Sequence, residues 1–130
     1  MKQSVLIFLV AFIIDQSTKY FFLNAGSAIL NPGVSFNLLH ATSSLVLTVG
    51  LGVCISGLWF AFRSYWDEHT RLAALFFAGA LSNLLDRVLY GAVVDWLPIP
   101  GLAIHNNLAD WYIAVSLIAV LYTYTVSVKT

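Results

Sequence analysis

Long apolar runs alternate with short polar stretches along the 130 residues of this chain. Four runs can be read, at about residues 5–23, 45–62, 72–90 and 108–128. Each run is close to the ~20 residues that an α-helix needs to cross about 30 Å of hydrocarbon. The pattern therefore predicts an all-α membrane protein with four transmembrane helices.

The composition agrees with this prediction. Hydrophobic residues make up 60% of the chain and charged residues only 9%, whereas a soluble domain carries about 25% charged residues. We expect one membrane-embedded domain over residues 1–130. The formal net charge is zero, and no cysteine or histidine cluster has the spacing of a zinc site. We therefore expect neither a nucleic-acid partner nor a bound metal.

The basic residues predict how the helices are oriented. An even number of spans puts both termini on one side of the membrane. Lys2, Arg63, Arg71 and Lys129 all fall at the helix ends or in the loop of that side. The positive-inside rule makes this side cytoplasmic, so residues 63–70 are predicted to form a short cytoplasmic turn.

The polar residues inside the apolar runs gather toward the opposite, outer side. Four of the six acidic residues lie inside or at the edge of apolar runs: Asp15, Asp86, Asp95 and Asp110. An ionised carboxylate costs at least ~2.5–3.5 kcal/mol in hydrocarbon, so such acids are candidates for function. Because these acids converge at one level, we predict a buried polar site near the outer surface of the membrane.

Local spacing suggests partners for these acids. Asp15 and Lys19 are four residues apart on one helix face, which favours an ion pair. Asp86 stands next to Arg87, and we interpret these two as a second charge pair that stabilises the fold.

The fourth helix begins near Asn107 and Asp110. Side chains at such a position accept hydrogen bonds from free backbone N–H groups and meet the positive end of the helix dipole.

The two predicted outer segments, residues 24–44 and 91–107, contain helix-breaking residues. Asn31, Pro32 and Gly33 form a turn signal, and residues 34–38 alternate weakly like a short strand. Residues 92–97 are apolar around Asp95. Irregular backbone cannot face lipid, so we expect this stretch to pack on protein or line a polar cavity.

Taken together, the polar strings resemble those of the lipoprotein signal peptidases, the type II signal peptidases of bacteria. Five strings match in the family's order: Asp15-Gln16 with Lys19; Asn31, Gly33 and Phe36; Gly79, Asn83, Asp86 and Arg87; Gly91, Val93, Val94 and Asp95; and Asn107, Ala109 and Asp110. One departure is Asn106, which stands where the family usually has phenylalanine. The first outer segment and the stretch between Asp95 and Asp110 are also shorter than usual.

The resemblance implies an aspartic endopeptidase in a four-helix membrane bundle with a small extracytoplasmic β-structured cradle. It implies Asp95 and Asp110 as the catalytic pair, without metal or cofactor. Substrate binding and positioning would fall to Asn31, Gly33, Asn83, Arg87 and Asn107, with Asp15, Lys19 and Asp86 as structural polar residues.

The resemblance also implies a substrate and a location. The substrate would be a diacylglyceryl-modified prolipoprotein, cut just before its lipidated cysteine, at the outer face of the bacterial cytoplasmic membrane. We expect a monomer that contacts membrane lipid, with both termini in the cytoplasm.

The chemistry is reasonable from the residues alone. Two close carboxylates share one proton, so that one can activate a water while the other polarises a carbonyl. Two other functions remain open. A small proton or cation transporter would spread its acids across the membrane depth, and a non-catalytic membrane scaffold would leave the strings around Asp95 and Asp110 unexplained.

Overall fold

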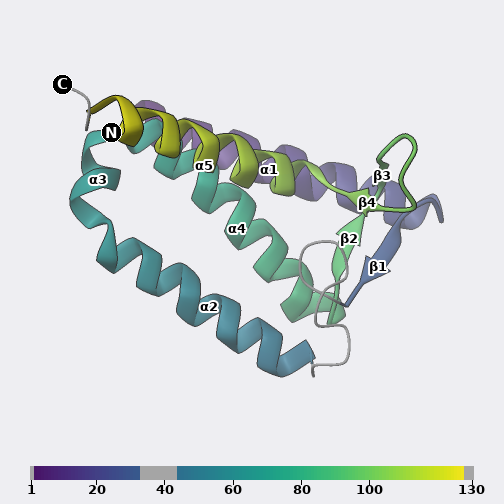
Figure 1. Ribbon diagram of the computed structural model, residues 1–130. Coiled ribbons are helices and arrows are strands. Elements are labelled where there is room, and N and C mark those ends of the chain that lie inside the picture. Colours follow the sequence, from purple (N-terminus) through teal and green to yellow (C-terminus); the bar gives the residue numbers. More distant parts are fainter. Residues whose placement is uncertain (1, 33–43, 128–130) are drawn as a thin grey trace.

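The computed structural model describes residues 2–32 and 44–127. Its elements, in chain order, are α1 (Lys2–Asn24), β1 (Ile29–Asn31), α2 (Ser44–Ala61), α3 (Arg63–Glu68), α4 (Thr70–Tyr90), β2 (Val93–Asp95), β3 (Leu97–Pro98), β4 (His105–Asn106) and α5 (Leu108–Ser127). The fold is mostly helical, with two small sheets (Figure 1).

The four predicted apolar runs all form helices, with boundaries within three residues of those expected. The predicted turn at residues 63–70 is partly wrong, because most of it folds into the short helix α3. By length and composition, α1 and α4 are able to cross a membrane. Within the described residues, α2 and α5 contribute shorter apolar stretches, Leu45–Ala61 and Leu108–Thr123.

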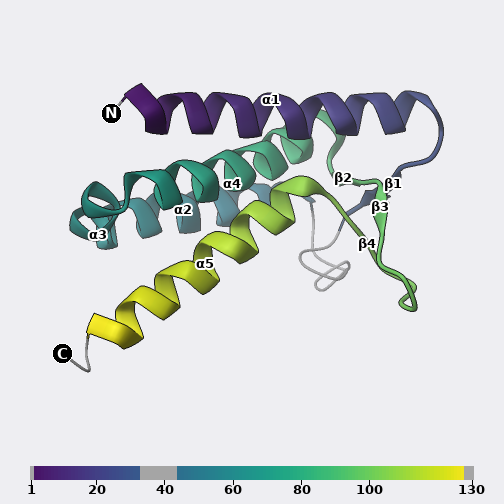
Figure 2. The same ribbon diagram turned by 90° about the horizontal axis from the view of Figure 1, so that it is seen from above.

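Helix α4 is the centre of the molecule and packs against both α1 and α5 (Figure 2). Small residues make this possible, since Ala73, Ala78, Gly79 and Ala80 are all buried on α4. Packing between membrane helices relies on such residues because they let backbones approach closely. At Gly79, an added Cβ would lie 2.5 Å from the carbonyl oxygen of Ala109 on α5.

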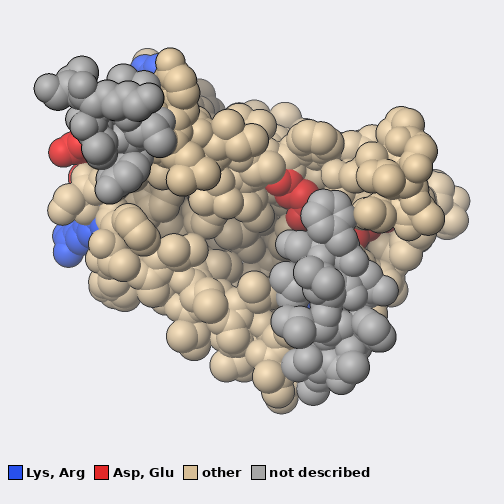
Figure 3. Space-filling view, in the orientation of Figure 1, with Lys and Arg blue, Asp and Glu red and all other residues tan. Residues whose placement is uncertain are grey.

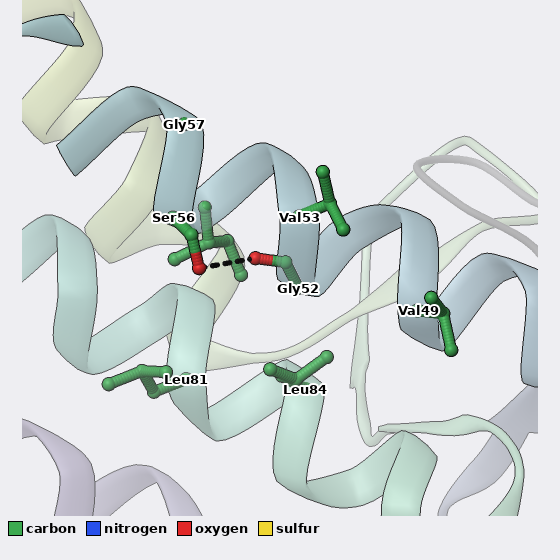
Figure 4. A pocket seen from close by; sticks show the side chains of 8 residues that line it. Val49, Gly52, Val53, Ser56, Gly57, Leu81 and Leu84 are labelled. Carbon is green, nitrogen blue, oxygen red and sulfur yellow. Dashed lines mark hydrogen bonds between the residues drawn. The ribbon is translucent and has the colours of Figure 1, made fainter. Parts of the chain in front are cut away.

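Helix α2 packs on α4 less extensively than α1 and α5 do, and it leaves apolar hollows beside α4. Figure 4 shows one, of about 610 Å³, which is lined by Leu81 and Leu84 of α4 and by Val49 and Val53 of α2. Within α2, the Ser56 hydroxyl turns back to the Gly52 carbonyl oxygen at 2.9 Å, so this wall exposes little polar surface. A second hollow, of about 550 Å³, continues toward α3.

The strands lie at one end of the helices, opposite α3, the start of α1 and the far end of α5 (Figure 1). Strand β1 pairs antiparallel with β2, and β3 pairs antiparallel with β4. The chain enters β2 through Gly91, which ends α4 in the left-handed conformation at a φ of 69°. Residues 92–94 are buried, which confirms that this apolar stretch packs on protein. The predicted strand at 34–38 and the candidate Gly33 lie outside the described residues.

Candidate active site

The start of α5 holds Asp110 in a fixed orientation. Asn107 precedes the helix, and its side-chain oxygen accepts from the Asp110 backbone N–H at 3.1 Å. The Asp110 carboxylate in turn accepts from the Asn107 backbone N–H at 3.3 Å. This reciprocal arrangement is a capping box, so the expected use of these residues at a helix start is confirmed.

Asp95, the last residue of β2, receives one amide donor on each carboxylate oxygen. Asn107 Nδ2 donates to Oδ1 at 2.7 Å, and Asn31 Nδ2 donates to Oδ2 at 2.9 Å. Asn31 reaches Asp95 because β1 pairs with β2. The small sheet therefore carries one side of the site, and α5 carries the other.

Asn107 joins the two acids, since it binds the Asp95 carboxylate through its amide and the Asp110 carboxylate through its backbone. Asn83 of α4 adds a donor to Asp110 Oδ1 at 2.9 Å. The structure thus brings together Asp95, Asp110, Asn31, Asn83 and Asn107. Asp95 and Asn107 are buried, whereas Asp110 is only partly buried and keeps access from outside the protein.

The environment of Asp95 favours its protonated form. Burial raises the pKa of Asp95 from 3.8 to about 6, and the nearby charge of Asp110 pushes the pKa in the same direction. The amides of Asn31 and Asn107 act against this rise because they stabilise the ionised carboxylate. A carboxyl group with such a pKa can exchange a proton near neutral pH.

A second polar cluster is centred on Lys19 and adjoins Asp110 through Asn83. Its ammonium is 2.7 Å from Asp15 and 2.8 Å from Asp86, and all three side chains are almost completely buried. The predicted pair of Asp15 with Lys19 is confirmed. Asp86, which the sequence led us to pair with Arg87, is turned by α4 toward α1 and forms an ion pair with Lys19.

Gln16 and Ser82 also belong to this cluster, although sequence reasoning gave neither a role. Ser82 donates its hydroxyl to Asp15, and Gln16 Nε2 donates to the Ser82 hydroxyl at 2.7 Å and to Asp86 at 2.9 Å. The sequence spacing could have indicated Ser82, because it lies four residues before Asp86 and therefore on the same face of α4.

Asp15 links α1 directly to the start of α5. Its Oδ1 accepts from the Ala109 backbone N–H at 2.8 Å. This N–H is one of those that a helix start leaves without an intrahelical partner. Asp15 therefore fixes the residue that immediately precedes Asp110.

Arg87 is turned inward in the last turn of α4. Its side chain is 5% exposed, and Nη1 donates to the Pro32 carbonyl oxygen at 3.3 Å. Arg87 therefore holds the chain just after Asn31 of β1, where the described part of this segment ends.

Asn106, which stands where related sequences usually have phenylalanine, forms two side-chain hydrogen bonds. With its oxygen facing Trp111, the Asn106 amide accepts from Trp111 Nε1 at 3.1 Å and donates to the Leu97 carbonyl oxygen at 3.1 Å. Asn106 thereby ties the β3–β4 hairpin to the first turn of α5. A phenylalanine could form neither hydrogen bond.

Acidic side chains are visible in a recess near the strands, and both acidic and basic side chains lie at the end that holds α3 (Figure 3). Within residues 2–32 and 44–127, no group of three or more His, Cys, Asp or Glu side chains is arranged to hold a metal ion. The arrangement of the recessed acids supports acid–base chemistry by a pair of carboxyl groups.

Comparison with known proteins identifies the family to which this chain is similar. Residues 7–126 match the family model described as signal peptidase (SPase) II. Over 89 residues the chain is 34% identical to the lipoprotein signal peptidase of Polynucleobacter necessarius, in a match that covers 65% of this chain and 50% of that protein. Over 130 residues it is 31% identical to the lipoprotein signal peptidase of Bifidobacterium adolescentis, covering 84% of this chain and 68% of that one. The match thus spans half the length of the first relative.

A solved structure, described as a bacterial membrane enzyme determined by the in meso method at 2.3 Å, has the same fold. The two chains superpose with a TM-score of 0.75 at 24% sequence identity, over 96% of this chain and 88% of the other. Because the family model covers nearly the whole sequence and its polar strings converge on one site, this chain belongs to the signal peptidase II family.

Proposed function

We propose that this chain is an aspartic endopeptidase that removes signal peptides from diacylglyceryl-modified prolipoproteins, cutting before the lipidated cysteine. Asp95 and Asp110 act as the catalytic pair. The observation that carries the proposal is the double attachment of Asn107 to both carboxylates, through its amide to Asp95 and through its backbone to Asp110. The family membership agrees with it.

The pair works by sharing one proton. The ionised carboxylate removes a proton from a water, and the water oxygen attacks the carbonyl carbon of the scissile bond. The protonated carboxyl group donates its proton to the carbonyl oxygen as negative charge develops there. As the tetrahedral intermediate collapses, the hydroxyl formed from the carbonyl oxygen returns its proton to the carboxylate that supplied it and the C=O bond forms again. The C–N bond breaks, and the leaving nitrogen takes up the proton that the other carboxylate removed from the water.

The amide groups around the pair keep this geometry fixed. Asn31, Asn83 and Asn107 each donate to a carboxylate oxygen, and these contacts hold the acids in place before substrate arrives. Arg87 orders the neighbouring segment through the Pro32 carbonyl oxygen. In this proposal Arg87 and Gly33 also contribute to holding the substrate backbone.

We place residues 1–130 in the membrane as a single domain with four transmembrane helices. The support is the arrangement of the two ends of the molecule. Arg63 begins the short helix α3 and Arg71 lies in the first turn of α4, at the end where α1 begins and α5 ends. The positive-inside rule puts this end in the cytoplasm. The strands and the acid pair then face outward and form the extracytoplasmic cradle.

The substrate enters from the bilayer in this proposal. The hollow between α2 and α4 is lined mainly by apolar side chains of these two helices (Figure 4). An acyl chain held there contributes binding energy far from the scissile bond, which can position that bond at the acids. Both carboxylates come from one chain, so a monomer is sufficient for activity.

The test is a gel-shift assay that follows cleavage of a purified lipidated precursor in detergent or bilayer. The parent is expected to cleave it, and Asp95→Asn and Asp110→Asn are each expected to abolish turnover while keeping the parent's thermal unfolding. Glu68→Gln, at an exposed position of α3, is the matched control and is expected to keep parent turnover.

The same assay tests the role of the lipid. Non-lipidated precursor is expected to be cut far more slowly than lipidated precursor. Equal rates on the two forms would instead indicate a general membrane protease. Near-parent turnover in either carboxamide variant would remove that residue from the catalytic pair.

A further inference from the structure

The ammonium of Lys19 uses all of its hydrogen-bond donors inside the protein. A lysine ammonium has three N–H groups and no acceptor. These groups have three partners, which are the buried carboxylates of Asp15 at 2.7 Å and Asp86 at 2.8 Å and the side-chain oxygen of the partly buried Asn83 at 2.8 Å. Lys19 itself is 2% exposed, so no solvent competes for these donors.

The third of these contacts fixes the orientation of the Asn83 amide. An asparagine amide can be turned by half a revolution, which exchanges its oxygen and its NH₂ group with little change in shape. In the observed orientation, the oxygen faces Lys19 and the NH₂ group donates to Asp110 at 2.9 Å. The reverse orientation would set NH₂ against the ammonium and oxygen against the carboxylate.

We propose that Lys19 is a positioning residue for the catalytic pair, because it holds the Asn83 amide with its NH₂ group toward Asp110. The inference rests on the proposed role of Asp110 as a catalytic acid. Under it, Oδ1 of Asp110 is always a hydrogen-bond acceptor. The shared proton is therefore kept off Oδ1 of Asp110 and away from Asn83.

The remaining contacts of the cluster separate this role from simple charge pairing. Asp15 also accepts from the Ser82 hydroxyl and the Ala109 N–H, and Asp86 also accepts from Gln16 and the Val94 N–H. These contacts fasten α1, α4, α5 and β2 to one another. Among the contacts of residues 2–32 and 44–127, the bond from Lys19 to Asn83 is the one that continues directly to a carboxylate of the pair.

The test is a double-mutant cycle between Lys19 and Asn83, measured as cleavage of lipidated precursor. Lys19→Met and Asn83→Ala are each expected to lower kcat by about 100-fold, the scale of a small misplacement of a catalytic group. KM is expected to change by less than about 3-fold, since neither effect acts on substrate binding.

The kcat of the double variant shows whether Lys19 acts through Asn83 or whether the two substitutions lower kcat independently. If Lys19 acts through Asn83, the double variant is expected to be no more than about 3-fold slower than the slower single variant. Multiplicative losses in the double variant, or a loss in Lys19→Met that lies wholly in KM, would overturn the proposal.

A charge-balanced variant keeps the test decisive if Lys19→Met alone fails to fold. Lys19→Met combined with Asp86→Asn removes one cation together with one anion, so the buried cluster keeps its net charge. This pair is expected to be as slow as Lys19→Met in kcat. Asp86→Asn alone, which leaves the bond to Asn83 in place, is the matched control and is expected to lose clearly less. Equal losses in the control and the pair would overturn the proposal.

A second readout does not depend on turnover. The side-chain amide resonances of Asn83, assigned by their loss in Asn83→Ala, are expected to shift in Lys19→Met and to stay in place in Glu68→Gln. Unchanged Asn83 resonances in Lys19→Met would overturn the proposal. A parent that fails to cleave the precursor would instead overturn the proposed function, which the resonances do not test.

Discussion

Replacing Gly79 with alanine tests how closely the contact of α4 with α5 sets the position of Asp110. The added Cβ would lie 2.5 Å from the Ala109 carbonyl oxygen and 3.1 Å from Cγ1 of Ile113. The Ile113 side chain can rotate away, but the Ala109 oxygen belongs to the backbone directly before Asp110. Since Cβ contacts below 3.0 Å are essentially never observed, α5 must shift by roughly 0.5 Å or more.

The expected cost follows from this shift. Overpacking of a close contact costs about 1–3 kcal/mol, and alanine recovers up to about 1 kcal/mol through its higher helix propensity. We therefore expect a net loss of stability of about 0–2 kcal/mol. The effect on kcat is expected to be larger, about 10-fold or more, because a displacement near 1 Å can cost about 100-fold.

The assay combines thermal unfolding with cleavage of lipidated precursor, and Gly50→Ala serves as the matched control. A Cβ at Gly50 would meet nothing within 4 Å in the described part of the protein. The control is expected to keep parent kcat and to gain up to about 1 kcal/mol. If Gly79→Ala behaves like Gly50→Ala in both measurements, the contact does not position Asp110 and the reasoning is refuted.

Three further predictions concern stability. A pKa of about 6 for folded Asp95, against 3.8 ordinarily, means that the folded state binds this proton more tightly. Lowering the pH from 7 to 5 should therefore stabilise the parent by about 1 kcal/mol, as seen in thermal unfolding, and Asp95→Asn should lose this increment; an equal increment in both would contradict it. Asp15→Asn should destabilise on the order of 3 kcal/mol by weakening the Lys19 cluster, and an unchanged unfolding temperature with lost turnover would argue against a structural role. Asn106→Ala should cost about 1–3 kcal/mol, because it removes two side-chain hydrogen bonds of about 0.5–1.5 kcal/mol each; unchanged unfolding would show that the two bonds contribute nothing.

The sequence by itself determined the helices and the residues of the site. Runs of about 20 apolar residues form helices wherever they occur, because a helix satisfies its backbone hydrogen bonds internally. Charged and amide residues inside such runs are costly, so Asp15, Lys19, Asp86 and Asp110 were identifiable without coordinates. The capping role of Asn107 followed as well, since it depends on residues only three positions apart.

Only the tertiary structure decided which polar groups are partners. Sequence adjacency suggested that Asp86 pairs with Arg87, but neighbouring residues on a helix point in different directions, and α4 turns Asp86 toward Lys19. The contacts from Asp15 to Ala109 and from Lys19 to Asn83 join residues 94 and 64 positions apart. Such contacts depend on how closely the helices approach, which the glycine at position 79 and the small residues of α4 set jointly. No local pattern records that distance, because it results from the packing of three helices at once.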